Sequence, residues 1–156
     1  MLSIILFLYS LFLIAPNHTY VLPDYKETRL YVIENSEFSE EFLKEYVGLI
    51  EVNHKNIVIA KSMLETGNYT SKIFKENNNL FGMKRPLIRP NLVTGSRRGH
   101  ATYNHWTDSV KDYVLWYEYF TQFNPDYTNY LQFLILNNYA EDPAYIRKLN
   151  YIIANL

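Results

Sequence analysis

The chain of 156 residues has no cysteine, few glycines and prolines, and no excess of charge of either sign. The absence of cysteine excludes a disulfide scaffold, a thiolate zinc site and a cysteine nucleophile. Five glycines and six prolines exclude collagen-like and low-complexity chains. The formal net charge of −1 excludes binding to nucleic acid through an overall positive charge.

Aromatic residues are abundant, with 15 tyrosines, nine phenylalanines and two tryptophans. They favour either a ring-rich core or a surface that stacks on sugars or bases. Apolar residues make up 48% and charged residues 20% of the chain, a balance typical of a folded protein rather than a disordered one. The length fits a single domain.

An uncharged apolar run, LSIILFLYSLFLIA, occupies residues 2–15. A helix over this run spans about 21 Å, less than the roughly 30 Å of a bilayer's hydrocarbon core. The length fits the apolar region of a secretory signal, although no Lys or Arg precedes it and no A-x-A site follows it. We therefore predict a signal peptide or short membrane anchor over residues 1–16 and an exported protein; the alternative is a buried first helix or strand. Residues 17–36 are predicted to be a tether with a short extended piece around Arg29–Ile33.

Residues 37–156 are predicted to form one mainly α domain with a small hairpin. Ser39 is a predicted N-cap, because its side chain can accept a hydrogen bond from the first helical turn. Asn53 or Asn56 is predicted to cap the next helix, which ends at Gly67.

Glycines, prolines and β-prone runs in residues 77–105 predict a turn followed by a hairpin. The remaining helices are predicted to begin at residues that favour N-caps: Thr107 or Asp108, then Asp126, then Asp142 with Pro143 in the first turn.

Glu65 lies in the last turn of the helix that is predicted to end at Gly67. A carboxyl group on the apolar side of such a helix is partly desolvated, which raises its pKa, and the negative end of the helix dipole acts in the same direction. An acid that keeps its proton near neutral pH can serve as a general acid. The alternative is a solvated helix end.

The segment NNNLFGMK, residues 77–84, predicts a fixed turn, because Asn side chains bond their own backbone and tolerate left-handed conformations. Such a turn can present amide groups and a ring to a ligand, or it can simply connect two helices. No acidic residue occurs between Asn77 and Thr107. The five cations of this stretch predict a basic lobe that attracts an anionic polymer, with a solvated face as the alternative: Lys84, Arg85, Arg89, Arg97 and Arg98.

Four segments follow one another in the order of a known family's motifs. AKSMLETG at residues 60–67 is similar to A-x-x-x-L-E-S/T-G, and NNLFGMK at 78–84 is similar to N-N-L-F-G-I-K. YNHWTDSVKDY at 103–113 resembles Y-x-S-W-x-x-S-V-x-D-Y/H, and YAEDPAY at 139–145 resembles Y-A-T-D-P-x-Y. Together they span roughly residues 40–156 and resemble the glucosaminidase family of peptidoglycan hydrolases, which is glycoside hydrolase family seventy-three of the lysozyme-like superfamily.

This resemblance implies a lysozyme-like helical domain whose groove, between the hairpin and the helices, holds an extended glycan. It implies that Glu65 protonates the glycosidic oxygen and that Tyr103 lies beside the scissile bond. The implied bond is the β-1,4 linkage on the reducing side of N-acetylglucosamine in peptidoglycan. The implied substrate-binding residues are Asn79, Leu80, Phe81, Gly82 and Met83 in the turn, and Trp106.

The sequence departs from the family pattern in its second carboxylate. Glycosidases usually use two carboxylates, and this family often places the second in the hairpin, where residues 77–107 contain none. Asp108 or Asp112 could reach in from the next helix, although both are expected to cap it or face solvent. The two favoured alternatives are attack by the substrate's 2-acetamido group and attack by a water that Tyr103 positions. A further alternative is a chain that binds glycan without cleaving it.

The sequence features leave two alternative functions open. Muramidase or lytic transglycosylase action on the same polymer is the nearest alternative activity, and a non-catalytic cell-wall binding module is the alternative outside enzymes. We expect no metal and no cofactor, because the four histidines show no ligand spacing such as H-E-x-x-H. The expected partner is the peptidoglycan glycan strand and not nucleic acid. We expect membrane contact only through residues 2–15, and a monomer.

Overall fold

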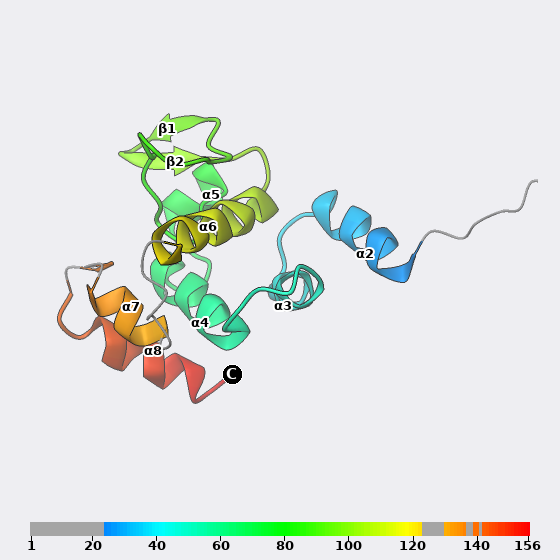
Figure 1. The fold of residues 1–156 in the computed structure, drawn as a ribbon. Helices are drawn as coiled ribbons and strands as arrows, with labels where there is room; N and C mark the ends of the chain where they lie inside the picture. Colours follow the sequence, from blue (N-terminus) through cyan, green and yellow to red (C-terminus); the bar gives the residue numbers. More distant parts are fainter. Residues whose placement is uncertain (1–23, 123–129, 137–138, 141) are drawn as a thin grey trace, which may run out of the picture.

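The computed structural model describes residues 24–122, 130–136, 139–140 and 142–156. These residues form helices and one two-stranded antiparallel sheet, in which Ser96 pairs with Ala101 (Figure 1). The elements in chain order are α2 (Tyr25–Glu34), α3 (Glu40–Leu49), α4 (Lys55–Thr66), α5 (Lys72–Asn77), β1 (Gly95–Arg97), β2 (His100–Thr102), α6 (Trp106–Thr121), α7 (Tyr130–Leu136) and α8 (Tyr145–Ile153). The predicted mainly α fold with one small hairpin is therefore confirmed.

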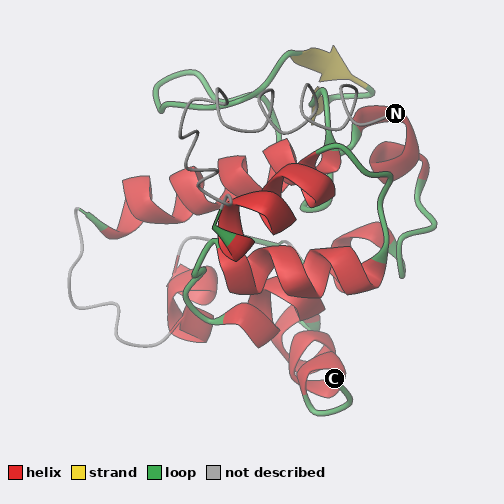
Figure 2. Cartoon of the chain, turned by 90° about the vertical axis from the view of Figure 1, so that its right-hand side faces the viewer, coloured by secondary structure: helices red, strands yellow, loops and turns green. Residues whose placement is uncertain are grey.

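The hairpin and α8 lie at opposite ends of the molecule, with α6 and α4 between them (Figures 1 and 2). Trp106, at the start of α6, forms the centre of the ring-rich core. Its ring meets those of Phe38 and Tyr46 edge-on, and its indole N–H donates to the carbonyl oxygen of Ser36 (3.1 Å). The abundant aromatic residues thus contribute largely to the core.

Two of the predicted helix ends are confirmed. The Ser39 hydroxyl accepts a hydrogen bond from the Phe42 N–H (3.0 Å) at the start of α3. The helix α4 ends at Gly67, whose φ of +55° lies in the left-handed region that glycine adopts at little cost. Glu65 consequently stands in the last turn of α4, as the sequence predicts.

The start of α4 differs from the prediction that Asn53 or Asn56 caps it. His54 stands at the N-cap position in a left-handed conformation, and no side chain caps the helix. The carbonyl oxygen of His54 instead accepts two N–H groups of the first turn directly, so a polar side chain is not needed there.

The helix α6 begins at Trp106, ahead of the predicted Thr107 or Asp108. The ring nitrogen Nδ1 of His105 accepts from the Thr107 N–H, and the Asp108 carboxylate accepts from the His105 N–H (3.3 Å). These two bonds form a capping box in which histidine replaces the usual serine or threonine. Asp108 is therefore a capping residue.

At the C-terminal end, α8 begins at Tyr145 rather than next to Asp142. Asp142 and Pro143 form the preceding turn, where the Asp142 carboxylate accepts from the Ala144 N–H (2.8 Å). The predicted helix start at Asp126 lies outside the described residues.

Near the N-terminus, residues 25–34 form α2, so the predicted extended piece around Arg29–Ile33 is wrong. Arg29 pairs with Glu45 of α3 (2.6 Å), and Ile33 is fully buried in the core. Ile33 is the only buried residue of α2, so the helix leaves almost no apolar periodicity in the sequence. The apolar run at 2–15 lies outside the described residues. None of the helices described has the length and apolar character needed to cross a membrane.

The loop between the turn and the hairpin is fastened to α6 by a buried ion pair. Both guanidinium Nη atoms of Arg89 donate to the Asp112 carboxylate (2.9 and 2.8 Å), and Asp112 is fully buried. The Leu92 N–H and the Tyr103 hydroxyl donate to the same carboxylate. Asp112 therefore neither caps α6 nor faces solvent, and the expectation for it is wrong.

This arrangement also corrects the predicted basic lobe. Arg89 is buried, and Arg97 and Arg98 both pair with Glu76 of α5 (3.3 and 2.9 Å). Among the described residues, only Lys84 and Arg85 of the five cations make no ion pair.

Asp112→Asn keeps the side-chain shape but leaves the buried Arg89 guanidinium without its counter-charge. We expect the free energy of unfolding to fall by about 3–5 kcal/mol, the range for breaking a buried ion pair from one side. Urea unfolding followed by circular dichroism measures this change. Arg97→Gln breaks an exposed pair and should leave the midpoint unchanged. Equal midpoints for Asp112→Asn and the wild type would contradict this account of the loop.

Candidate active site

The Glu65 carboxyl group lies where α4, α8 and the turn after α5 meet. Its Oε1 accepts a hydrogen bond from the Tyr145 hydroxyl of α8 (2.8 Å). Its Oε2 lies against Gly82, where an added Cβ atom would come within 3.3 Å. Glu65 keeps some exposed surface, but most of its carboxyl group is shielded from water.

The end of α4 is fixed by the residue that follows Glu65. Thr66 is buried, and its hydroxyl donates to the Ser62 carbonyl oxygen (2.6 Å) and accepts from the Tyr69 N–H (2.8 Å). Together with the left-handed Gly67, these bonds hold the last turn in one conformation. The direction of the Glu65 side chain therefore follows from the sequence ETG.

Asn79 holds the neighbouring turn in shape. Its Nδ2 donates to the carbonyl oxygens of Met83 and Ala101, both at 2.9 Å, and its Oδ1 accepts from the Phe81 and Met83 N–H groups. The turn is thereby tied to β2. Gly82, at a φ of +62°, brings bare backbone next to Glu65.

Most of the predicted substrate-binding residues of this turn are buried. The buried ones are Asn79, Leu80, Phe81 and Met83, whereas Gly82 keeps some exposed surface. Phe81 stacks on Tyr113 of α6, with ring centroids 4.3 Å apart. The turn lies beside Glu65 as expected, but substrate contact by its residues stays a prediction.

Tyr103 and Trp106 are both engaged elsewhere. The Tyr103 hydroxyl donates to Asp112 (2.8 Å), and its pKa is raised by burial and by that carboxylate. Trp106 is 2% exposed, which leaves it no face on which a sugar could stack. Trp106 is thus part of the core, like the buried residues of the turn, and substrate contact by Trp106 stays a prediction. The role of Tyr103 beside the scissile bond stays a prediction.

The environment of Glu65 raises the pKa of its carboxyl group, and burial is the main cause. Three groups act in the opposite direction: the nearby amine of Lys61, the hydrogen bond from Tyr145 and the ring of His100. The predicted direction of the shift and its cause, desolvation, are confirmed. The shift is in the direction that favours a general acid, although the role of Glu65 in catalysis stays a prediction.

Two residues of this site were not singled out from the sequence. Tyr145 appeared only as the last residue of the YAEDPAY motif, and Lys61 only as part of AKSMLETG. Lys61 lies one helical turn before Glu65, so the i, i+4 spacing is the signal that could have found it.

Two of the described histidines, His100 and His105, have their rings close to backbone carbonyl oxygens. Nδ1 of His100 lies 2.9 Å from the Arg98 carbonyl oxygen, and Nε2 of His105 lies 2.8 Å from that of Ser36. Within the described part of the chain, no three His, Asp or Glu side chains are placed to hold a metal ion.

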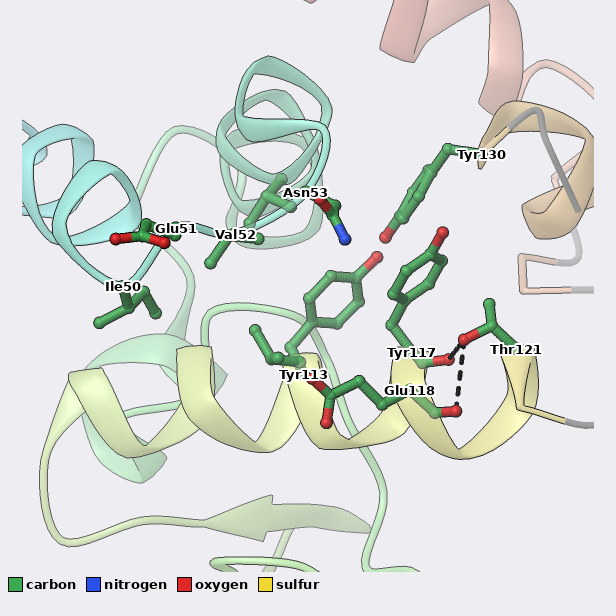
Figure 3. Close-up of a pocket in the computed structure, with 11 residues that line it drawn as sticks. Ile50, Glu51, Val52, Asn53, Tyr113, Tyr117, Glu118, Thr121 and Tyr130 are labelled. Atoms are coloured by element: carbon green, nitrogen blue, oxygen red, sulfur yellow. Dashed lines mark hydrogen bonds between the residues drawn. The ribbon is translucent and has the colours of Figure 1, made fainter. Parts of the chain in front are cut away.

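A separate cavity of about 190 Å³ lies between the α3–α4 connection, α6 and α7, and Glu65 does not line it. Figure 3 shows the hydroxyls of Tyr113, Tyr117 and Tyr130 pointing toward one another within it. The hydroxyls of Tyr113 and Tyr130 are buried and have no hydrogen-bond partner. A polar cavity of this size suits ordered water. The predicted glycan groove beside Glu65 stays a prediction.

Residues 41–156 match a family model described as glucosaminidase, mannosyl-glycoprotein endo-beta-N-acetylglucosaminidase. The matched range contains Glu65, the turn, the hairpin and Tyr145. Searches of curated proteins and of solved structures returned no match.

Gly82→Ala places a methyl group against the Glu65 carboxylate on left-handed backbone. We expect a stability loss of about 1–2 kcal/mol from the backbone, together with displacement of the carboxyl group. Gly99→Ala is the matched control, because Gly99 has a φ of +76° with nothing within 4 Å of its Cβ position. Thermal unfolding should show similar losses for both variants. Only Gly82→Ala should shift the NMR signals of the Tyr145 ring, and equal shifts in both would contradict the contact.

Proposed function

The chain belongs to the glucosaminidase family, and we propose that it cleaves the β-1,4 bond on the reducing side of N-acetylglucosamine in peptidoglycan. The family supports a peptidoglycan hydrolase at this general level. The observation that carries the finer proposal is Glu65, a largely shielded carboxyl group with a raised pKa at the end of α4.

In this proposal, Glu65 donates its proton to the glycosidic oxygen as the bond to the anomeric carbon breaks. The proton leaves with the departing sugar hydroxyl, and the Glu65 carboxylate remains. The Tyr145 hydroxyl, 2.8 Å from Oε1, can donate to that carboxylate and keep it in place. The bare backbone at Gly82 leaves room for a sugar to approach Oε2 closely.

The second group of the reaction is proposed to come from the substrate. Asp108 caps α6 and Asp112 is paired with Arg89, so neither carboxylate is free to act as a base or nucleophile. The Tyr103 hydroxyl is also occupied as a donor to Asp112. Attack by the 2-acetamido oxygen on the anomeric carbon requires none of these residues. A water would then open the cyclic intermediate, and the Glu65 carboxylate would take up the proton of that water.

The location of the substrate determines where we propose that the protein acts. Peptidoglycan lies outside the cytoplasmic membrane, so the chain is proposed to be exported, with residues 1–16 as signal or anchor. It is proposed to act as a monomer on glycan strands and to need no cofactor.

Glu65→Gln removes the proton donor and keeps the side-chain volume. General acid catalysis contributes about 10²–10⁴-fold in rate, so clearing of cell walls in a gel should disappear while circular dichroism stays unchanged. Glu41→Gln, at an exposed glutamate of α3, is the matched control and should clear normally. Clearing by the Glu65→Gln variant would contradict the mechanism.

Mass analysis of the ends that the wild type releases from purified peptidoglycan tests the bond. Reducing N-acetylglucosamine ends support the proposal. Reducing N-acetylmuramic acid ends would indicate a muramidase, 1,6-anhydro ends a lytic transglycosylase, and binding without release a non-catalytic module.

The proposed mechanism makes the enzymatic activity depend on pH, because Glu65 must carry a proton. Because burial raises the pKa of Glu65, the acid should remain protonated above the pH at which an ordinary glutamate ionises. Activity should fall as the pH rises through this raised pKa, since the carboxylate cannot donate. Initial rates of wall solubilisation across pH measure the profile. A decline that coincides with the ordinary pKa of glutamate would contradict the shielded acid.

A further inference from the structure

Lys61 is a fully buried lysine whose amine has no hydrogen-bond partner among the residues that the structure describes. It lies in α4, whose apolar side packs on the core. Burying an ammonium group in this way costs several kcal/mol unless another group compensates for the lost water. An apolar residue would fill the same position without this cost. The lysine therefore calls for a physical explanation.

Three aromatic rings enclose the amine. Lys61 Nζ lies 2.7 Å from the ring centroid of Tyr139, 4.5 Å from that of Tyr113 and 5.2 Å from that of Trp116. The face of an aromatic ring carries partial negative charge, so such a cage stabilises a cation without a hydrogen-bond acceptor. The surroundings of Nζ thus suit an ammonium group.

The same rings connect the amine to the turn beside Glu65. The Tyr139 hydroxyl donates to the Phe81 carbonyl oxygen (2.7 Å), and Tyr113 stacks on the Phe81 ring. Lys61 and Glu65 lie four residues apart, on neighbouring turns of one face of α4. The turn therefore lies next to both the ring cage and Glu65.

Few other charged or titratable groups face this pair. Among the described residues, those around Glu65 are Tyr145 from α8, His100 from β2 and the cage residue Tyr139, and the turn contributes the backbone of Gly82. Around Lys61 they are the three rings of its cage and Glu65 itself.

We propose that Lys61 is a positioning residue for Glu65, whose amine in the ring cage provides the counter-charge of the Glu65 carboxylate. This role rests on the proposed function, because a counter-charge is needed when Glu65 gives up its proton to the glycosidic oxygen. The ammonium form stabilises the carboxylate that remains after that transfer. The Lys61 charge also lowers the pKa of Glu65, which burial raises, so that Glu65 remains acidic enough to give up its proton.

The electrostatics of the pair agree with this role. Burial lowers the pKa of Lys61 well below its ordinary value, and the charge of Glu65 raises it again. The amine therefore holds its proton most firmly when Glu65 is ionised. In turn, the Lys61 charge lowers the pKa of Glu65 against the effect of burial. Removing the amine must then raise the pKa of Glu65.

Lys61→Met tests the proposal, because methionine fills the cage without a charge. Methionine needs no hydrogen-bond partner in the cage, and Glu65 can stay protonated and uncharged when the amine is removed, so the variant should fold. We expect the alkaline limb of the pH–rate profile to move up by about one pH unit or more, the size of shift that a close counter-charge causes. The plateau kcat should fall while KM is unchanged. Lys75→Met, at an exposed lysine of α5, is the matched control and should keep the wild-type profile.

A second readout does not depend on activity. In protein labelled with ¹³C-glutamate, the Glu65 carboxyl signal is identified by its absence from the Glu65→Gln spectrum. Its titration midpoint should be higher in Lys61→Met than in the wild type. An equal or lower midpoint would overturn the role of Lys61. A wild type without wall-degrading activity would instead refute the proposed function, while the two midpoints would still decide whether Lys61 is the counter-charge.

Discussion

The shielding of one carboxyl group is the constraint on which the rest of this structure depends. Burial raises the pKa of the Glu65 carboxyl group, and Gly82 and Tyr145 both lie against that group while some of its surface stays open. Each neighbour comes from a separate part of the chain. The end of α4, the Asn-rich turn and the start of α8 must therefore all be in place for the carboxyl group to have these surroundings. Three of the four family motifs contain these segments, at residues 60–67, 78–84 and 139–145.

Three of the five cations in the lobe around the hairpin are paired with carboxylates of the chain itself. Arg89 pairs with the buried Asp112, and Glu76 neutralises much of the charge of Arg97 and Arg98. These pairs fasten the loop and the hairpin to α6 and α5. The lobe then offers an anionic polymer less attraction than its sequence suggests. Recognition of a largely neutral sugar backbone would depend more on shape and hydrogen bonds at the turn.

The sequence predicts those parts of the fold and site that local chemistry determines. Ser39 and Gly67 act as helix caps because a side chain or a left-handed backbone satisfies the helix end locally. The position of Glu65 in the last turn of α4 can be predicted for the same reason, because Gly67 marks the end of the helix. Long-range partners are a different matter, because nothing in the sequence near Asp112 indicates that Arg89 will bury beside it. The spacing of Lys61 and Glu65 can be read from the sequence, but the cage that holds the amine depends on rings from α6 and from residue 139 that meet only in the folded chain.

The central claim, that Glu65 meets the glycosidic oxygen, is tested most directly by a crystal structure of the Glu65→Gln variant with a bound N-acetylglucosamine oligomer. The account predicts that the amide at position 65 lies within hydrogen-bond distance of a glycosidic oxygen, with the sugar passing over the backbone at Gly82. An oligomer bound elsewhere, such as at the tyrosine-lined cavity beside α7, would contradict it.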